Sequence, residues 1–230
     1  MTNPLQTYFP FGPPIGYAEL PRNLVNDFNK ACDDIVKSKE LSKSADRSHA
    51  LAGQVEQELS IPKNIINKWG KWFGTQVRIY VTGYFNQFAI PEQNIFRIPK
   101  KQALQAVNNL QTIFIDAWYI RSFAGDYNPI HTHTNCELTC VGFLKVPDLS
   151  KEHKKKDWGP NGALEILSSS GSNEKAFFEN DRIGFVPKVG NWYLFPANIR
   201  HSVYPFKCDG ERRSFSINMN TSMFKGPSDK

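Results

Sequence analysis

The first half of the chain carries apolar residues at helical spacing. Over residues 21–43 they recur every three or four positions, which predicts an amphipathic helix. A second run over residues 62–85 starts at a proline suited to the first helical position, and it predicts a long helix. We expect a shorter helix around residues 50–59. Residues 1–22 are rich in proline and aromatic side chains, which indicates an extended arm.

The pattern changes beyond Leu110, where short runs of β-branched and aromatic residues alternate with polar ones and are broken by Gly, Pro and Asn. The predicted strands cover residues 112–123, 138–146, 162–167, 183–186, 190–195, 202–204 and 213–218. Strands of this length and spacing are typical of an antiparallel sandwich or barrel. We therefore expect an α+β protein with a mainly β core. Its jelly roll spans residues 111–230, and the arm and helices of residues 1–110 pack on it within one compact domain.

Composition narrows the class of protein. The chain has 230 residues, of which 40% are hydrophobic and 13% aromatic, so it can bury a substantial core. Its four cysteines are too few and irregular for a secreted disulfide framework. The first residues lack the features of a signal peptide, and no apolar run could span a bilayer, so we expect a cytoplasmic protein without a membrane partner. The net charge is +6, but the lysines are scattered, and we expect no nucleic-acid partner.

Three of the five histidines lie in two short segments. His131 and His133 share one face if their segment is extended, and Glu137 falls on that face if the extension continues. His201 comes from a distant segment. A close pair and one remote imidazole can hold Fe(II) on one side and leave other positions open for substrate and oxygen. Taken alone, each histidine is more simply interpreted as a loop or core residue without a function, but the three together predict a metal site.

These motifs resemble the iron(II)- and 2-oxoglutarate-dependent oxygenases, in particular members related to prolyl hydroxylases. The resemblance runs from Trp118 to Asn218 and includes Trp118-Tyr-Ile-Arg, Gly125-Asp-Tyr, the histidine pair, Leu138 to Pro147, Gly162-Ala-Leu-Glu, Leu194-Phe-Pro, His201-Ser-Val and Glu211-Arg-Arg-Ser. It implies a double-stranded β-helix, the cupin-like form of the jelly roll, with Fe(II) as the metal and 2-oxoglutarate as the cosubstrate.

The same resemblance implies roles for Arg212 and Ser214. The family binds the far carboxylate of 2-oxoglutarate with a basic residue on a late strand, commonly in an Arg-x-Ser pattern. Arg212-Arg-Ser214 matches this pattern about eleven residues after His201. A guanidinium can hold a carboxylate through two parallel charge-assisted hydrogen bonds, and Ser214 lies on the same strand face. Arg213 is the alternative anchor, because a shift of one residue in register would exchange the two arginines.

One position departs from the family pattern. The family has Asp or Glu two residues after the first histidine, where this chain has His133. The predicted triad is therefore His131, His133 and His201, unless another carboxylate completes it. The spacing of the histidine pair and Glu137 also fits the first cupin motif, and the segment from Gly190 to His201 resembles the second. A cupin would use Glu137 as a fourth ligand and would not need 2-oxoglutarate.

We therefore expect an Fe(II)- and 2-oxoglutarate-dependent dioxygenase that hydroxylates a C–H bond of a peptidyl or amino-acid-like substrate. The alternatives are a cupin-type dioxygenase or isomerase and a non-catalytic jelly-roll binding module. Tyr119 and Trp192 are candidate pocket walls, although each is more simply a core residue. The expected specificity loops, residues 148–161 and 168–182, carry no motif that identifies the substrate. The sequence indicates no oligomeric state.

Overall fold

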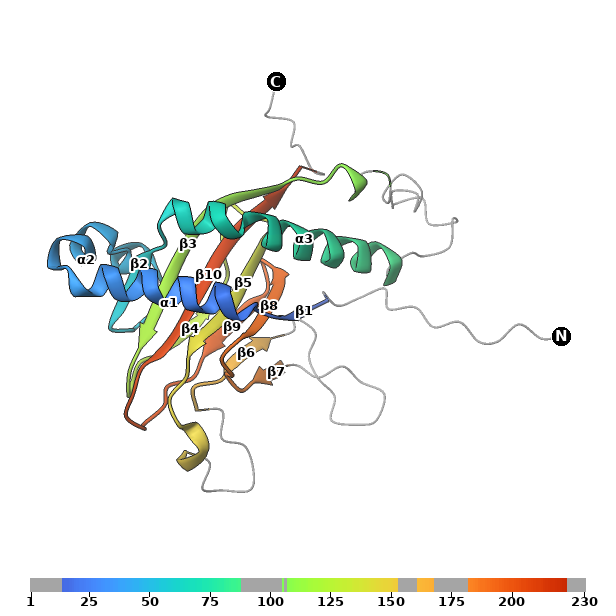
Figure 1. Ribbon diagram of the computed structural model, residues 1–230. Helices are drawn as coiled ribbons and strands as arrows, with labels where there is room; N and C mark the ends of the chain where they lie inside the picture. The colour runs from blue at the N-terminus through green and yellow to red at the C-terminus, as the bar shows by residue number, and fades with distance from the viewer. Residues whose placement is uncertain (1–13, 88–104, 106, 153–160, 168–181, 223–230) are drawn as a thin grey trace, which may run out of the picture.

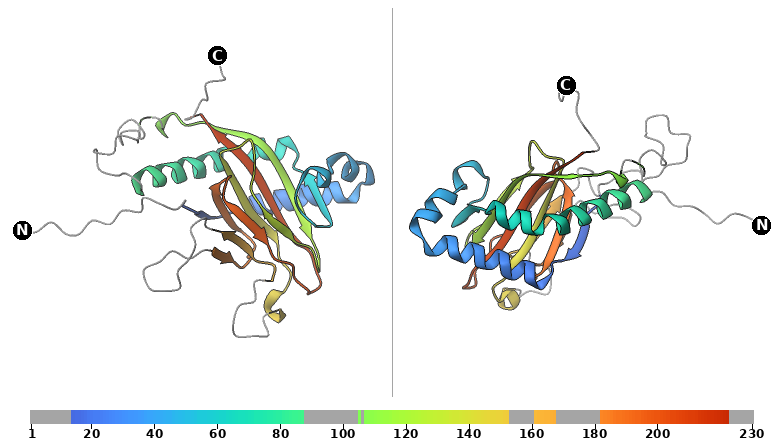
Figure 2. Two further views of the ribbon diagram at one scale, coloured as in Figure 1. Left: turned by 180° about the vertical axis from the view of Figure 1, so that it is seen from behind. Right: turned by 45° about the horizontal axis from the view of Figure 1, so that its top comes forward.

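The computed structural model describes residues 14–87, 105, 107–152, 161–167 and 182–222 of the chain. Two antiparallel sheets form the core, and two long helices lie across the outer face of the larger sheet (Figure 1). Seen from behind, the smaller sheet lies on the side away from the helices (Figure 2). The molecule thus has three layers, which are helices, larger sheet and smaller sheet.

The larger sheet contains six strands in an order that is not sequential. Along the sheet they are β1 (Gly16–Glu19), β8 (Asn191–Pro196), β5 (Leu138–Lys145), β10 (Arg212–Thr221), β3 (Thr112–Ser122) and β2 (Gln57–Ser60). The smaller sheet is made of β4 (Asn128–His131), β9 (Arg200–Val203), β6 (Leu164–Leu167) and β7 (Arg182–Phe185). From β3 onward the strands pair first with last, as β3 with β10, β4 with β9, β5 with β8 and β6 with β7. This pairing winds one long hairpin into a jelly roll, which confirms the predicted fold class.

The segment before residue 111 also contributes strands. β1 and β2 pair at the two edges of the larger sheet, with β8 and β3 respectively. The prediction of a helix around residues 50–59 was wrong, because this segment forms a 3-10 turn, η1 (Ser48–Ala50), and then β2. Pairing with β3 satisfies the backbone of β2, and Leu59 is fully buried in the core, so tertiary contacts override the local preference. Of the predicted arm, residues 1–13 lie outside the described part.

The described residues before β3 include three helices. The long helix predicted from residue 62 is α3 (Lys63–Gln87). The helix predicted over residues 21–43 is divided into α1 (Arg22–Lys37) and α2 (Lys39–Ala45). The break falls at Ser38, whose backbone is extended and whose hydroxyl accepts a hydrogen bond from the N–H of Leu41. Ser38 therefore caps α2, a role that short polar side chains commonly have at helix starts.

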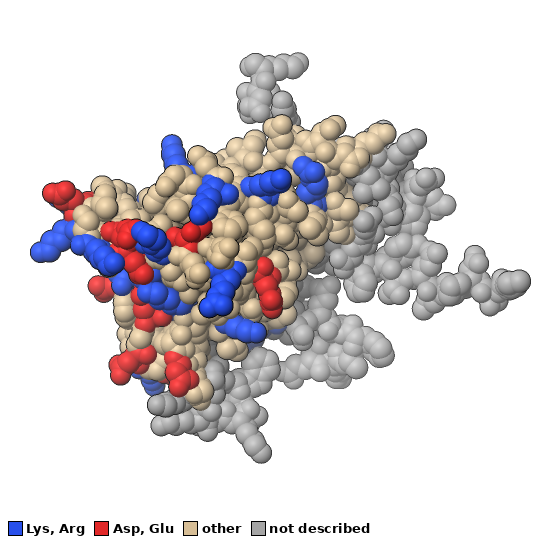
Figure 3. All heavy atoms as spheres, viewed as in Figure 1, with Lys and Arg blue, Asp and Glu red and all other residues tan. Residues whose placement is uncertain are grey.

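The buried faces of α1 and α3 form the main core with the outer face of the larger sheet. The rings of Phe28, Phe73 and Phe215 lie at its centre, with centroids 4.8–6.2 Å apart. Basic and acidic side chains are mixed toward the α2 end of the helical layer in Figure 3, whereas α3 carries Lys and Arg and no acidic residue. Within the described residues, none of the helices has the length and apolar character of a membrane span.

Candidate metal centre

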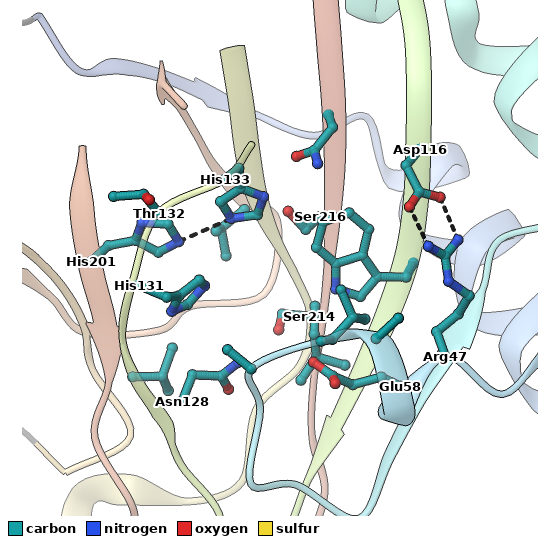
Figure 4. Close-up of a pocket in the computed structure, with 18 of the residues that line it drawn as sticks. Arg47, Glu58, Asp116, Asn128, His131, Thr132, His133, His201, Ser214 and Ser216 are labelled. Carbon is teal, nitrogen blue, oxygen red and sulfur yellow. Dashed lines mark hydrogen bonds and ion pairs between the residues drawn. The ribbon is translucent and has the colours of Figure 1, made fainter. Parts of the chain in front are cut away.

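Three imidazoles converge between the two sheets (Figure 4). His131 ends β4 and pairs directly with His201 on β9, while His133 follows two residues later. One nitrogen from each ring lies within 4.8 Å of the others, and Nε2 of His133 is 3.2 Å from Nε2 of His201. Two nitrogens bound at right angles to one ion at about 2.1 Å would be about 3 Å apart. The structure therefore brings the three predicted residues together at a spacing that fits a metal.

Backbone carbonyl groups fix the orientation of two of the rings. Nδ1 of His131 lies 2.7 Å from the carbonyl oxygen of Pro129, and Nδ1 of His201 lies 3.0 Å from that of Ile199. A carbonyl oxygen can only accept a hydrogen bond, so in both rings Nδ1 carries the proton. Each Nε2 keeps its lone pair for a ligand, which is the usual arrangement around metal-binding histidines.

A chain of hydroxyl groups sets the tautomer of His133. Nδ1 of His133 lies 3.4 Å from Oγ1 of Thr139, which lies 3.3 Å from Oγ of Ser216, and Ser216 donates to the carbonyl oxygen of Cys140 over 2.9 Å. Because that carbonyl takes the proton of Ser216, Ser216 accepts from Thr139, and Thr139 accepts from His133. The third ring thus also presents a free Nε2. Trp118 stacks on it, with centroids 5.5 Å apart.

Burial keeps these rings neutral. Desolvation and the neighbouring imidazoles lower the pKa of His133 to about 4 and that of His201 to about 3. Desolvation also lowers the pKa of His131. Near neutral pH the cluster therefore presents three uncharged donors, the form that binds a borderline metal such as Fe(II).

Glu137 does not join this cluster. Its Oε2 accepts hydrogen bonds from the backbone N–H and the hydroxyl of Thr221, both at 2.7 Å. The alternation that would have placed Glu137 beside the histidines is interrupted at Asn135, which has a φ of 60°. The carboxylate instead ties the start of β5 to the end of β10. Among the described residues, the group of possible metal ligands here consists of the three histidines.

A cavity of about 390 Å³ extends from the histidines between the sheets, and Arg212 and Ser214 line it. Arg212 is 1% exposed, its Nε donates to the carbonyl oxygen of Gly162, and its Nη1 donates to Ser214. Its Nη2 has no hydrogen-bond partner among the described residues. The guanidinium lies 5.0 Å from the ring centroid of Phe143, and burial lowers its pKa to about 10. A buried cation without a counter-ion is costly, so this site calls for an anionic ligand.

Arg213 points to the opposite side of β10. Its guanidinium forms ion pairs with Glu211 and Asp33, each at 2.8 Å, and it also donates to Asn29 on α1. These contacts fasten α1 to the sheet, and Arg213 does not line the cavity. The structure therefore places Arg212 and Ser214 in the cavity and Arg213 in the helical layer.

The other residues that line the cavity differ from those that the sequence indicated. Tyr119 and Trp192 pack in the core beneath the helices, so the core interpretation of these two holds. Trp118 lines the cavity instead. Ser216, Asn128, Asn218 and Glu58 also line the cavity, and the sequence indicated no role for these residues because isolated polar residues on strands are not enough to reveal one. Most of the two expected specificity loops lies outside the described residues.

Glu58 is the least expected of the cavity residues. It is 1% exposed, and its Oε2 has no hydrogen-bond partner among the described residues. Burial, together with the negative charge of Asp46, raises its pKa from the usual 4.5 to about 7. Between these two values the folded state binds more protons than the unfolded state, so the stability contributed by this group falls as pH rises from about 4.5 to 7.

We expect Glu58→Gln to stabilise the ligand-free protein at pH 8, by about 2 kcal/mol, and to have little effect near pH 4.5. The substitution removes a buried charge that exists only at the higher pH and keeps the side-chain volume. Urea unfolding of both proteins at the two pH values measures the difference. Glu56→Gln, at an exposed neighbouring position, is the matched control. An equal effect at both pH values would contradict the prediction.

Comparison with known proteins agrees with this geometry. Residues 116–218 match a family described as "Putative 2OG-Fe(II) oxygenase". A search of curated proteins found no match. Among solved structures, a prolyl-4-hydroxylase from Pseudomonas putida aligns with a TM-score of 0.51 and 15% identity, over 90% of this chain and 91% of that chain. A prolyl hydroxylase from Trichoplax adhaerens, solved in complex with a hypoxia inducible factor oxygen degradation domain peptide fragment, aligns with a TM-score of 0.51 and 10% identity, over 90% of this chain and 83% of that chain.

At identities of 10% and 15% the two solved structures support the jelly-roll fold alone. The family match supports the use of Fe(II) and 2-oxoglutarate. The matched segment contains the three histidines, Arg212 and Ser214. The family uses Fe(II) and 2-oxoglutarate, and the three-histidine cluster fits an iron ion. The resemblance indicated by the motifs is therefore confirmed: over residues 116–218 the chain is similar to the iron(II)- and 2-oxoglutarate-dependent oxygenases.

Proposed function

We propose that the protein is an Fe(II)- and 2-oxoglutarate-dependent dioxygenase that hydroxylates a C–H bond of a peptide or amino-acid-like substrate. The observation that carries the proposal is the buried guanidinium of Arg212, which lines the same cavity as the three imidazoles and whose Nη2 has no hydrogen-bond partner among the described residues. A metal centre alone would need no buried cation. A metal centre together with a cation matches a ligand that has a chelating end and a separate carboxylate.

In this proposal His131, His133 and His201 hold the iron through their Nε2 atoms. Arg212 and Ser214 bind the far carboxylate of 2-oxoglutarate, which gives Nη2 of Arg212 a partner that it does not have among the described residues. Bound Fe(II) and 2-oxoglutarate would activate O2, the oxidant: the cosubstrate would lose CO2 and take one oxygen atom to become succinate, and the other atom would convert the substrate C–H bond to C–OH. The protein holds these groups in position and limits the access of water.

The neutral ligand set has an electrostatic consequence. Three imidazoles leave the full 2+ charge of the ion uncompensated, whereas a carboxylate ligand would cancel part of it. The keto-acid end of 2-oxoglutarate brings a negative charge to the ion, and its other end brings one to Arg212. Apolar wall residues such as Val141 and Leu164 lower the local polarity and so strengthen both interactions.

The class of substrate is inferred from the neighbours. One solved structure with this fold is a prolyl-4-hydroxylase and another is a prolyl hydroxylase in complex with a peptide fragment. We therefore favour a peptide or an amino-acid-like small molecule. The position of Glu137, whose carboxylate is bound to Thr221, favours this proposal over a cupin-type enzyme that uses Glu137 as a ligand.

Anaerobic titration of the Fe(II)-loaded protein with 2-oxoglutarate tests the proposal. We expect the weak visible charge-transfer band of a chelated keto acid to appear and to saturate. Iron binding without this band would overturn the dioxygenase assignment and favour a metal enzyme that does not use 2-oxoglutarate. Failure to bind any metal would indicate a jelly-roll binding module.

A further inference from the structure

The cavity has a second polar region on the side of β2 and the loop before it. Its wall is formed by Glu58 on β2, Asn128 on β4 and loop residues that include Leu51. Glu58 pairs in register with Ile120, which pairs with Ser214, so the three side chains lie in one row on the inner face of the sheet. Figure 4 shows the carboxyl group of Glu58 directed into the cavity, toward the side from which Asn128 comes.

Two acceptor atoms in this region have no donor among the described residues. Oε2 of Glu58 and Oδ1 of Asn128 are both buried and have no hydrogen-bond partner among the described residues. The nearby basic residue, Arg47, holds Asp116 through two bonds of 2.6 Å and is therefore already neutralised. Asp46 adds further negative potential at Glu58. When Glu58 is ionised, the region thus has an excess of negative charge, whereas Arg212 gives the other region of the cavity an excess of positive charge.

The loop holds the carboxylate in place. A Cβ on Gly53 would lie 2.7 Å from Oε1 of Glu58 and 3.1 Å from Nδ2 of Asn128, so the loop backbone packs closely against both side chains. Gln54 and Tyr127 then exchange two backbone hydrogen bonds, at 2.9 and 3.1 Å, which join the loop to the segment before β4. With the loop closed over it, the carboxyl group cannot turn outward to water, and its orientation is set before any ligand binds.

We propose that Glu58, assisted by Asn128, is the subsite for a cationic nitrogen of the substrate, an ammonium or a guanidinium group. The inference rests on the proposed function and names its substrate class, a peptide or amino acid with a basic side chain. A cation here donates a charge-assisted hydrogen bond to Glu58 and removes the cost of a buried, unpaired carboxylate. A neutral side chain of the same shape leaves that cost in place, so the pocket discriminates against it.

Calorimetric titration of the anaerobic protein loaded with Fe(II) and 2-oxoglutarate tests this subsite. The probes are N-acetyl-L-arginine amide and N-acetyl-L-lysine amide, each paired with a neutral counterpart, N-acetyl-L-citrulline amide and N-acetyl-L-norleucine amide. We expect at least one basic probe to bind about 30-fold more tightly than its neutral counterpart, as for a buried charge-assisted pair. In Glu58→Gln this preference should fall to within about threefold, while Glu56→Gln should retain it.

Two results would overturn the subsite. One is an equal affinity for basic and neutral probes, including no binding of either. The other is a preference that persists unchanged in Glu58→Gln. The keto-acid band, recorded on the same samples, reports separately on the proposed function. Its absence from the wild-type protein would reject the dioxygenase assignment. The calorimetric comparison, repeated without 2-oxoglutarate, would still decide the role of Glu58.

Discussion

Replacement of Arg212 by methionine is expected to weaken the binding of 2-oxoglutarate about 100-fold or more. Methionine fills a similar volume against Phe143 but offers no donor to a carboxylate. Loss of a buried charge-assisted contact to a carboxylate costs about 3 kcal/mol, which corresponds to that change in affinity. The ligand-free protein should lose little stability, because the removed cation has no carboxylate partner among the described residues. Anaerobic titration of the keto-acid band measures the affinity, and urea unfolding measures the stability.

Arg213→Met is the matched control, since it removes the same side chain from the next position. Arg213 is as deeply buried as Arg212 but forms ion pairs with Glu211 and Asp33. Its loss leaves Glu211 without this partner and should destabilise the protein by about 3 kcal/mol, while the affinity for 2-oxoglutarate stays near that of the wild type. Wild-type affinity in Arg212→Met, or an equal loss of affinity in both variants, would reject the role assigned to Arg212.

Strand periodicity explains why part of the cavity could be predicted from the sequence. Side chains alternate along a strand, so Arg212 and Ser214 had to share a face, and so did His131 and His133 if their segment was extended. The third histidine, in contrast, comes from a distant part of the sequence. His201 was found because a remote histidine is the usual complement of a close pair, and the first-with-last pairing of β4 with β9 places it opposite His131.

The positions of other polar residues in and near the cavity depend on features that a local pattern does not contain. Glu137 would share the face of the histidines only if the extension continued, and Asn135 ends the alternation because it adopts a positive φ. Glu58 lies in a segment whose local pattern favoured a helix, and only pairing with β3 turns it into a strand that points a carboxylate inward. Thr139 and Ser216 act on His133 through a chain of hydroxyl groups across two strands, which becomes visible only when the register of β5 and β10 is known.

His201→Ala is expected to reduce Fe(II) affinity at least 100-fold and to abolish 2-oxoglutarate turnover. The substitution removes one of three protein ligands, and loss of a group that merely orients a ligand already costs 10- to 100-fold in affinity. Nε2 of His201 lies 3.2 Å from that of His133, so the substitution also separates His133 from its neighbouring ligand. Equilibrium dialysis with Fe(II) under anaerobic conditions measures the affinity directly, without reference to a substrate.

The control is His49→Ala, which removes an imidazole from the exposed 3-10 turn before β2 and should leave iron binding unchanged. Because His201 is 2% exposed, its removal leaves a small buried space, and the unfolding transition of the variant shows whether the sheets still close around it. A folded His201→Ala protein that binds iron as tightly as the wild type would remove His201 from the metal centre. If the folded His201→Ala protein has lost iron and the His49→Ala protein binds it normally, the iron site includes His201 and does not depend on His49.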